Sequence, residues 1–214
     1  MTATKITELK ENLSTICKLV FDHGYTPGKS GNISTRSNET DLLITPSGWS
    51  FMDIKPNDIV HVSSDGSVQT LKPSSELPVH KIIYDTRTDI NAVIHAHPTK
   101  ATALAVAGID LNTHIIPELS VSLGPVPLIA YRLPGSPELA NDVKKAFENN
   151  HQAILMANHG VITTGRDLKE AFFNLQLLES FAEIVITCKQ LGTINTLTGA
   201  QVEEIYQLKA SMAH

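Results

Sequence analysis

Apolar residues recur three or four positions apart in several stretches of the chain, which is the spacing of one face of a helix. The first stretch lies near the N-terminus and contains Ile6, Leu9, Leu13, Ile16, Cys17 and Val20. Gly24 marks its expected end. Further helices are predicted at about residues 75–86, 99–107, from 136 onward, 167–191 and 200–210. Ser75, Ser136 and Asp167 are the expected N-caps of three of them.

Short apolar runs bounded by turn residues predict strands between these helices. They cover residues 33–35, 42–45, 59–62, 68–71, 91–94, 126–131, 153–157 and 161–164. The first four read as two hairpins, the second of which turns at Asp65-Gly66. Hairpins interleaved with helices predict one α/β domain over residues 1–214, with a mixed or largely antiparallel sheet covered by helices on its faces.

The composition is ordinary for a soluble globular protein with a sizeable core. The chain has 214 residues, of which 42% are apolar and 18% charged, and its net charge is −5. Because it has no basic block and only 5% aromatic residues, we expect no nucleic-acid partner. No apolar run approaches the ~18 residues of a membrane span, and the N-terminus lacks the apolar segment of a signal peptide. We therefore expect a cytoplasmic protein without membrane contact.

Three histidines stand at the ends of two predicted strands. The pair His95 and His97 ends the run at residues 91–94, and His159 follows the run at residues 153–157. Side chains on a strand alternate between faces, so His95 and His97 should point the same way, roughly 7 Å apart. Three imidazoles that leave one coordination position of the ion open suit a catalytic Zn²⁺ or a related divalent ion. The alternative is a chance His-x-His pair in a chain with nine histidines.

Three short segments are rich in glycine, hydroxyl side chains and free backbone amides, which are the groups that bind phosphate. They cover residues 28–32, 45–48 and 74–75. Each segment alone is also typical of a turn or a helix cap. The first is neither a P-loop nor a dinucleotide-binding motif, because its glycines lack the required spacing. The sequence therefore predicts a phosphate pocket and gives little support to a nucleotide.

Glu76 follows the third of these segments and falls in the first turn of a predicted helix. The helix dipole favours a carboxylate there, which is a sufficient structural reason for its presence. An acid beside a phosphate and a metal can also ligate the metal or act as a base on the substrate. His80 lies one helical turn further on, and we interpret it as a structural residue.

Seven short motifs follow one another in order along the chain. They are G-N-I-S at residues 31–34, T-P-S-G at 45–48, P-S-S-E at 73–76, H-A-H-P at 95–98, P-E at 117–118, P-G-S-P-E-L-A at 134–140 and N-H-G at 158–160. In this order and spacing they resemble the class II aldolase/adducin superfamily, and within it the L-fuculose-1-phosphate aldolases. The resemblance runs from the first predicted helix to the long helix at residues 167–191.

This resemblance implies a three-layer α/β/α fold around a mostly antiparallel (mixed) sheet, and a homotetramer with active sites at subunit interfaces. It implies Zn²⁺, or a related ion such as Mn²⁺ or Co²⁺, held by His95, His97, His159 and Glu76. Glu76 is also the implied catalytic acid/base. The implied phosphate-binding positions are Gly31, Asn32, Ser47, Gly48, Ser74 and Ser75.

The implied reaction is metal-dependent aldol cleavage. A phosphorylated ketose resembling L-fuculose 1-phosphate would give dihydroxyacetone phosphate and an aldehyde through a metal-stabilised enediolate. The same scaffold supports sugar-phosphate 4-epimerases, dehydratases and decarboxylases, and the epimerases usually carry Asp where this chain has Glu76. A non-catalytic adducin-like module without metal is a further alternative, which the intact set of metal ligands disfavours.

One segment departs from the family pattern. The bacterial fuculose-phosphate aldolases place a catalytic Tyr just before the glycine-rich turn, and residues 114–119 of this chain contain none. Glu118 lies in that stretch, in a Pro-Glu pair that resembles other branches of the superfamily. We expect Glu118 to replace the Tyr as a catalytic proton donor, and the alternative is a surface acid.

Overall fold

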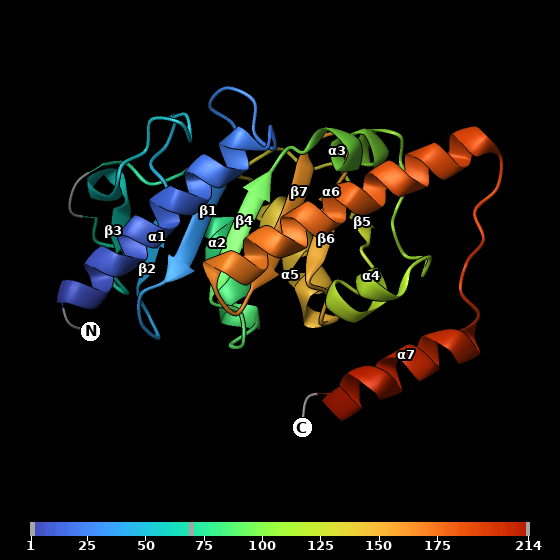
Figure 1. Ribbon diagram of the computed structural model, residues 1–214. Coiled ribbons are helices and arrows are strands. Elements are labelled where there is room, and N and C mark those ends of the chain that lie inside the picture. The colour runs from blue at the N-terminus through green and yellow to red at the C-terminus, as the bar shows by residue number, and fades with distance from the viewer. Residues whose placement is uncertain (1–2, 69–70, 213–214) are drawn as a thin grey trace.

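The computed structural model describes residues 3–68 and 71–212, which form one sheet with helices on both faces (Figure 1). In this part of the chain, seven strands lie in the order β3-β2-β1-β4-β7-β6-β5. Neighbouring strands are antiparallel except for β5 and β6, which are parallel. The strands are β1 (Asn32–Arg36), β2 (Leu42–Ile44), β3 (Val60–Val62), β4 (Ala92–Ala96), β5 (Leu128–Ile129), β6 (Ala153–Met156) and β7 (Gly160–Gly165).

Helices α1, α3 and α6 cover one face of the sheet, and α2 and α5 cover the other. The α-helices are α1 (Ala3–Asp22), α2 (Leu77–Thr86), α3 (Thr99–Val106), α4 (Pro117–Ser122), α5 (Pro137–Glu148), α6 (Leu168–Leu191) and α7 (Gly199–Met212). A short 3₁₀ helix, η1 (Pro56–Asp58), precedes β3. The α/β class and the three-layer arrangement expected from the sequence are confirmed.

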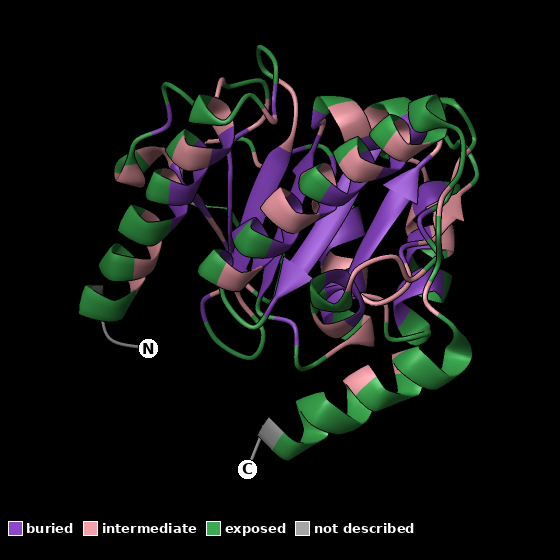
Figure 2. Cartoon of the chain, turned by 45° about the vertical axis from the view of Figure 1, so that its right-hand side comes forward, coloured by how far each residue is buried: buried purple, intermediate pink, exposed green. Residues whose placement is uncertain are grey.

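The sheet lies buried between helices whose outer faces are exposed (Figure 2). Successive side chains of β4 alternate between its two faces. Ile94 belongs to the core beneath α1, α3 and α6, whereas Val93 belongs to the core with α2 and α5. His95 is two residues after Val93 on the same strand, so its side chain lies on the same face as that of Val93, the face that α2 covers. This alternation places one predicted ligand toward the helix that carries Glu76.

Two of the three predicted N-caps are confirmed, and the third is wrong. The Ser136 and Asp167 side chains accept hydrogen bonds at the starts of α5 and α6. Helix α2 instead has Glu76 at its N-cap position, with no capping bond from that side chain. Ser74 Oγ accepts a hydrogen bond from the Glu76 backbone N–H at 3.2 Å, so the capping hydroxyl belongs to Ser74, one residue before the predicted Ser75. Ser75 is left exposed.

Two predicted strands need correction, and one helix was missed. The strand expected at residues 126–131 is shorter in the structure and consists of β5 alone. Val126 lies outside it and pairs with Leu111 as an isolated bridge. The strand expected at residues 68–71 contributes only the bridge from Val68 to Val62, and residues 69–70 lie outside the described part of the chain. Helix α4, which starts at a proline, was not predicted.

Helix α6 is long and apolar enough, by length and composition alone, to cross a membrane. In this fold it packs along the sheet against β4 and β7 and against α3. Leu175, Leu178 and Phe181 on its inner side are buried in the core. Its apolar face is therefore used within the domain.

Candidate metal centre and phosphate pocket

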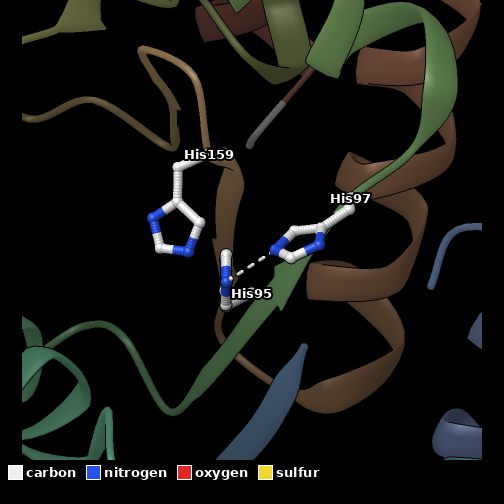
Figure 3. Close-up of side chains that lie close together, drawn as sticks. All are labelled: His95, His97 and His159. Atoms are coloured by element: carbon white, nitrogen blue, oxygen red, sulfur yellow. Dashed lines mark hydrogen bonds between the residues drawn. The ribbon is translucent and has the colours of Figure 1, made fainter. Parts of the chain in front are cut away.

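Three imidazole rings meet at one end of the sheet (Figure 3). His95 lies on β4, His97 follows the end of that strand, and His159 lies in the turn between β6 and β7. One ring nitrogen from each histidine lies within 4.8 Å of the others. His95 Nε2 and His97 Nε2 are 3.1 Å apart. The structure thus brings together three histidines that were predicted from two separate segments.

The backbone around the cluster constrains the rings. His95 Nδ1 donates to the Val161 carbonyl oxygen at 2.9 Å, which leaves the Nε2 lone pair of this ring for the cluster. Gly160 follows His159 in the chain, and a Cβ at this glycine would lie 2.4 Å from His97 Cδ2. Asn158 precedes His159 with a φ of 55°, a left-handed conformation that Asn adopts more readily than most residues. A larger residue in place of Gly160 would displace the His97 ring.

Glu76 lies beside the three rings, at the start of α2. Its Oε2 is 3.4 Å from His95 Nε2, and its Oε1 is 3.5 Å from His159 Nε2. The residue is buried, with 8% of its surface exposed. The fourth ligand implied by the resemblance is therefore within reach of an ion that the histidines hold.

The charge state of these groups suits a divalent cation. Burial on its own raises the pKa of Glu76, but His95, the hydrogen bond from Asn32 and His159 outweigh it, so the pKa lies below its ordinary value. Burial, and then His95, lowers the pKa of His97 to about 4 and moves the pKa of His159 in the same direction. At neutral pH the centre presents the unprotonated imidazoles of His97 and His159 and the Glu76 carboxylate, which are donors that Zn²⁺ prefers. The donor set therefore fits the metal.

A chain of buried side chains runs from Glu76 into the layer between β1 and α2. Asn32 Nδ2 donates to Glu76 Oε2 at 3.0 Å, and Asn32 Oδ1 lies 2.5 Å from His80 Nε2. Ser34 Oγ lies 2.6 Å from His80 Nδ1 and 2.8 Å from the Tyr84 hydroxyl. Ser34 and Tyr84 were not predicted as site residues. Ser34 ends the G-N-I-S motif, two residues after Asn32 on a strand, and the only signal for Tyr84 was its position four residues after His80 on a helix.

The second and third predicted phosphate segments run side by side. The Ser47 N–H donates to the Lys72 carbonyl oxygen at 2.9 Å, and the Ser74 N–H donates to the Thr45 carbonyl oxygen at 3.1 Å. These two bonds use the backbone amides of both serines. Donors for a phosphate from these segments therefore have to come from the hydroxyl groups and from neighbouring amides.

The remaining positions implied for phosphate lie around the same place. Gly48 and Ser75 are exposed, and Gly48 has a φ of 77° with nothing near its missing Cβ. Gly31 has a φ of 80°, and a Cβ there would lie 2.8 Å from the His95 carbonyl oxygen, so only glycine fits. Asn32 is next in the chain and reaches Glu76 directly. The first and third segments thus adjoin Glu76, and the second is hydrogen bonded to the third.

Glu118 is exposed on α4. Figure 1 shows α4 away from the end of β4 that carries the histidines. In residues 3–68 and 71–212, no hydrogen bond or ion pair connects Glu118 with the histidine cluster or with Glu76. One chain by itself does not bring Glu118 to the centre, so its predicted role requires a second subunit and stays a prediction.

Acid should destabilise the metal-free protein between about pH 6.5 and pH 4. Burial lowers the pKa of His80 to about 3, and burial together with His95 lowers the pKa of His97 to about 4. An unfolded histidine titrates near 6.5, so across this window the unfolded chain binds more protons and stability falls as the pH falls. Melting temperatures from circular dichroism would measure this. A His97→Gln variant should lose less stability than wild type over the window, and parallel curves would contradict the assignment.

Residues 11–186 match the family model described as the class II aldolase and adducin N-terminal domain. The chain belongs to this family. The resemblance drawn from the seven motifs is thereby confirmed, and the protein is a class II aldolase-like member of a superfamily of aldolases and decarboxylases.

Relatives within the family carry out more than one reaction. The chain is 34% identical over 204 residues to a 3-oxo-tetronate 4-phosphate decarboxylase of Escherichia coli, with 92% of this chain and 94% of that protein covered. It is 35% identical over 202 residues to a 5-deoxy-D-ribulose 1-phosphate aldolase of Bacillus thuringiensis, with 92% of each chain covered. A solved structure of an L-fuculose 1-phosphate aldolase matches with a TM-score of 0.87 at 33% identity, covering 97% of both chains. These similarities place the chain among enzymes that act on phosphorylated sugars or sugar acids by more than one reaction.

Proposed function

We propose that this protein is a metal-dependent aldolase that cleaves a phosphorylated ketose to dihydroxyacetone phosphate and an aldehyde. The observation that carries the proposal is the convergence of three imidazoles and the Glu76 carboxylate beside segments suited to phosphate. The proposed cofactor is Zn²⁺, or another divalent transition metal such as Mn²⁺ or Co²⁺. A 1-phosphorylated ketose resembling L-fuculose 1-phosphate is the proposed substrate class.

Each part of the centre has a distinct task in this proposal. His95, His97 and His159 would hold a divalent cation, which would supply Lewis acidity for a carbonyl group of the substrate. Glu76, which is ionised and lies beside these rings, accepts a proton and returns it. The segments around Ser75 bind the phosphate and so orient the bond that is cleaved. Glu118 from a neighbouring subunit is the proposed second proton donor.

Decarboxylation of a phosphorylated 3-oxo acid is the second candidate. It is favoured by the similarity to the 3-oxo-tetronate 4-phosphate decarboxylase, which extends over 92% of this chain. Loss of CO₂ beside a ketone and cleavage of an aldol both leave negative charge on the same type of carbonyl oxygen. The same donor set can serve both reactions, so the shape of the sugar pocket has to distinguish them.

We also propose a homotetramer with active sites at the subunit interfaces. The exposed position of Glu118, away from the centre of its own chain, supports a site completed by a neighbouring subunit. A cytoplasmic location without nucleic-acid or membrane partners completes the proposal, in line with the net charge of −5 and the absence of a basic block.

A product assay tests the reaction. Zinc-loaded protein would be incubated with a panel of ketose 1-phosphates and with 3-oxo-tetronate 4-phosphate, and dihydroxyacetone phosphate and CO₂ would be measured with and without a chelator. Chelator-sensitive release of dihydroxyacetone phosphate from one ketose is the expected result. The decarboxylase would instead release CO₂ together with dihydroxyacetone phosphate from 3-oxo-tetronate 4-phosphate and would cleave no ketose 1-phosphate. A zinc-loaded protein that forms neither product from any of these substrates would contradict both reactions.

Replacing Ser75 with alanine should raise KM about ten-fold for phosphorylated substrates and leave kcat nearly unchanged. The exposed hydroxyl offers a charge-assisted hydrogen bond to phosphate, which is worth roughly 1.5–3 kcal/mol. Steady-state kinetics on a phosphorylated ketose and on its unphosphorylated analogue would measure the effect. An equal change toward both substrates would remove Ser75 from the phosphate pocket.

A further inference from the structure

Five buried polar side chains form one continuous hydrogen-bonded chain that ends at the metal centre. They are Tyr84, Ser34, His80, Asn32 and Glu76. His80 and Ser34 are completely buried, and Tyr84 has only 2% of its surface exposed. The chain links β1 to α2 across the layer that separates them. We call these residues the Tyr84–Glu76 chain.

The hydrogen bonds of this chain run in one direction. A carboxylate can only accept, so the Asn32 amide nitrogen must face Glu76, and the Asn32 oxygen must face His80. That oxygen accepts, so His80 Nε2 carries a proton. His80 Nδ1 is then free to accept from the Ser34 hydroxyl, which in turn accepts from Tyr84. Every donor therefore points toward the carboxylate, an arrangement in which neighbouring bonds strengthen one another.

The orientation of the Asn32 amide matters to the centre. Turned by 180°, the amide would set its oxygen against the Glu76 carboxylate, and two acceptors would face each other. The same turn would set the Asn32 amide nitrogen against the His80 N–H, so two donors would face each other there. Glu76 is thereby held with its two oxygens 3.4 Å from His95 Nε2 and 3.5 Å from His159 Nε2.

We propose that His80 is a positioning residue of the metal centre, which holds the Asn32 amide in the one orientation that donates to Glu76. This inference rests on the metal-binding part of the proposed function. His80 touches neither the ion nor the substrate in this arrangement. Groups that orient metal ligands in this way typically change metal affinity by 10- to 100-fold when they are removed.

A merely structural His80 would behave differently in one measurable respect. Its replacement would lower stability, and any effect on metal binding would be independent of Glu76. A positioning residue acts through Glu76, so its effect on metal binding should vanish once the carboxylate is gone. A double-mutant cycle separates these cases, because residues in one hydrogen-bond network are not additive.

The cycle combines His80→Leu with Glu76→Gln and measures Zn²⁺ affinity by calorimetric titration of the metal-free proteins. In the wild-type background, His80→Leu should weaken Zn²⁺ binding about ten-fold or more. In the Glu76→Gln background the same substitution should change the affinity by roughly two-fold or less. Losses of equal size in both backgrounds, or no loss in either, would overturn the proposal.

Three further variants guard against loss of folding. His80→Gln keeps an N–H that can reach the Asn32 oxygen, and it should restore most of the affinity lost in His80→Leu. Ser34→Ala and Tyr84→Phe remove bonds one and two steps further from Glu76, so their effects should decrease in that order. Thermal melting of each metal-free protein reports stability separately. If His80→Leu does not fold, the same cycle with Ser34→Ala decides, and equal losses in its two backgrounds would overturn the proposal.

Failure of this proposal differs from failure of the proposed function. Wild-type protein that cleaves a ketose phosphate while the cycle is additive overturns the role of His80 alone. Wild-type protein that binds Zn²⁺ but cleaves no substrate overturns the reaction, and the cycle still decides on His80. Wild-type protein that binds no Zn²⁺ overturns the metal centre and this proposal together.

Discussion

Replacing His97 with alanine should abolish stoichiometric Zn²⁺ binding and reduce turnover to the level of the chelated wild-type enzyme. His97 supplies one of three imidazoles that approach one another within 4.8 Å, and a catalytic zinc site needs three protein ligands with an open position. Glu76 cannot restore turnover in place of His97, because a carboxylate that is fixed on the ion is no longer free to move a proton. The effect should therefore appear in metal content and in kcat together.

Metal content after dialysis, measured by emission spectroscopy, and kcat/KM on the accepted substrate test this result. His151→Ala is a matched control, because this half-buried histidine precedes β6 at the end opposite the turn that carries His159. Its Nδ1 bonds to the Pro125 carbonyl oxygen at 2.9 Å and to no group of the centre. The control should retain zinc and activity. A His97→Ala protein with full zinc content and full activity would refute the site assignment.

The sequence predicts that the three histidines and Glu76 lie together because these residues follow local rules. His95 and His159 each close a short apolar run. These runs form β4 and β6, which are both antiparallel to the strand β7 between them, so their C-terminal ends lie at the same edge of the sheet. Glu76 opens an amphipathic helix, and helix starts are marked by nearby residues. These four residues can therefore be selected from their spacing and side-chain chemistry, without knowledge of the three-dimensional structure.

The Tyr84–Glu76 chain could not be predicted in the same way. It depends on the register that sets Asn32 opposite His95 and Ser34 opposite Val93, and on the rotation of α2 against β1. Neither quantity is encoded in a single segment. A histidine one turn after Glu76 is as compatible with a packed core as with a site, and only the contact with Asn32 distinguishes the two roles.

Contacts between subunits are a second feature that the structure of a single chain does not give. Glu118 was predicted as a proton donor from a motif, yet the fold leaves it exposed on α4. The prediction that Ser75 is an N-cap was wrong for a simpler reason. Either of two adjacent serines can accept a backbone N–H at a helix start, and here the Ser74 hydroxyl accepts the one from Glu76. Local rules narrow such alternatives, and packing selects among them.

Replacing Glu76 with glutamine should lower kcat by about 10²- to 10⁴-fold, the usual size of a general acid/base contribution. Glutamine has nearly the same shape and still offers an oxygen to the Asn32 amide, so the site should keep its geometry. It cannot accept and return a proton. KM should change little, because the phosphate segments and the three imidazoles remain.

This substitution separates proton transfer from metal binding, which His97→Ala cannot do. The three histidines should still hold Zn²⁺ in Glu76→Gln, with an affinity weakened by loss of one carboxylate. Calorimetric titration with Zn²⁺ would show this, and single-turnover kinetics would isolate the chemical step. Loss of turnover with retained zinc assigns the proton to Glu76. Retained turnover would mean that another group transfers the proton. The Glu118 carboxylate of a neighbouring subunit would then be the next residue to substitute.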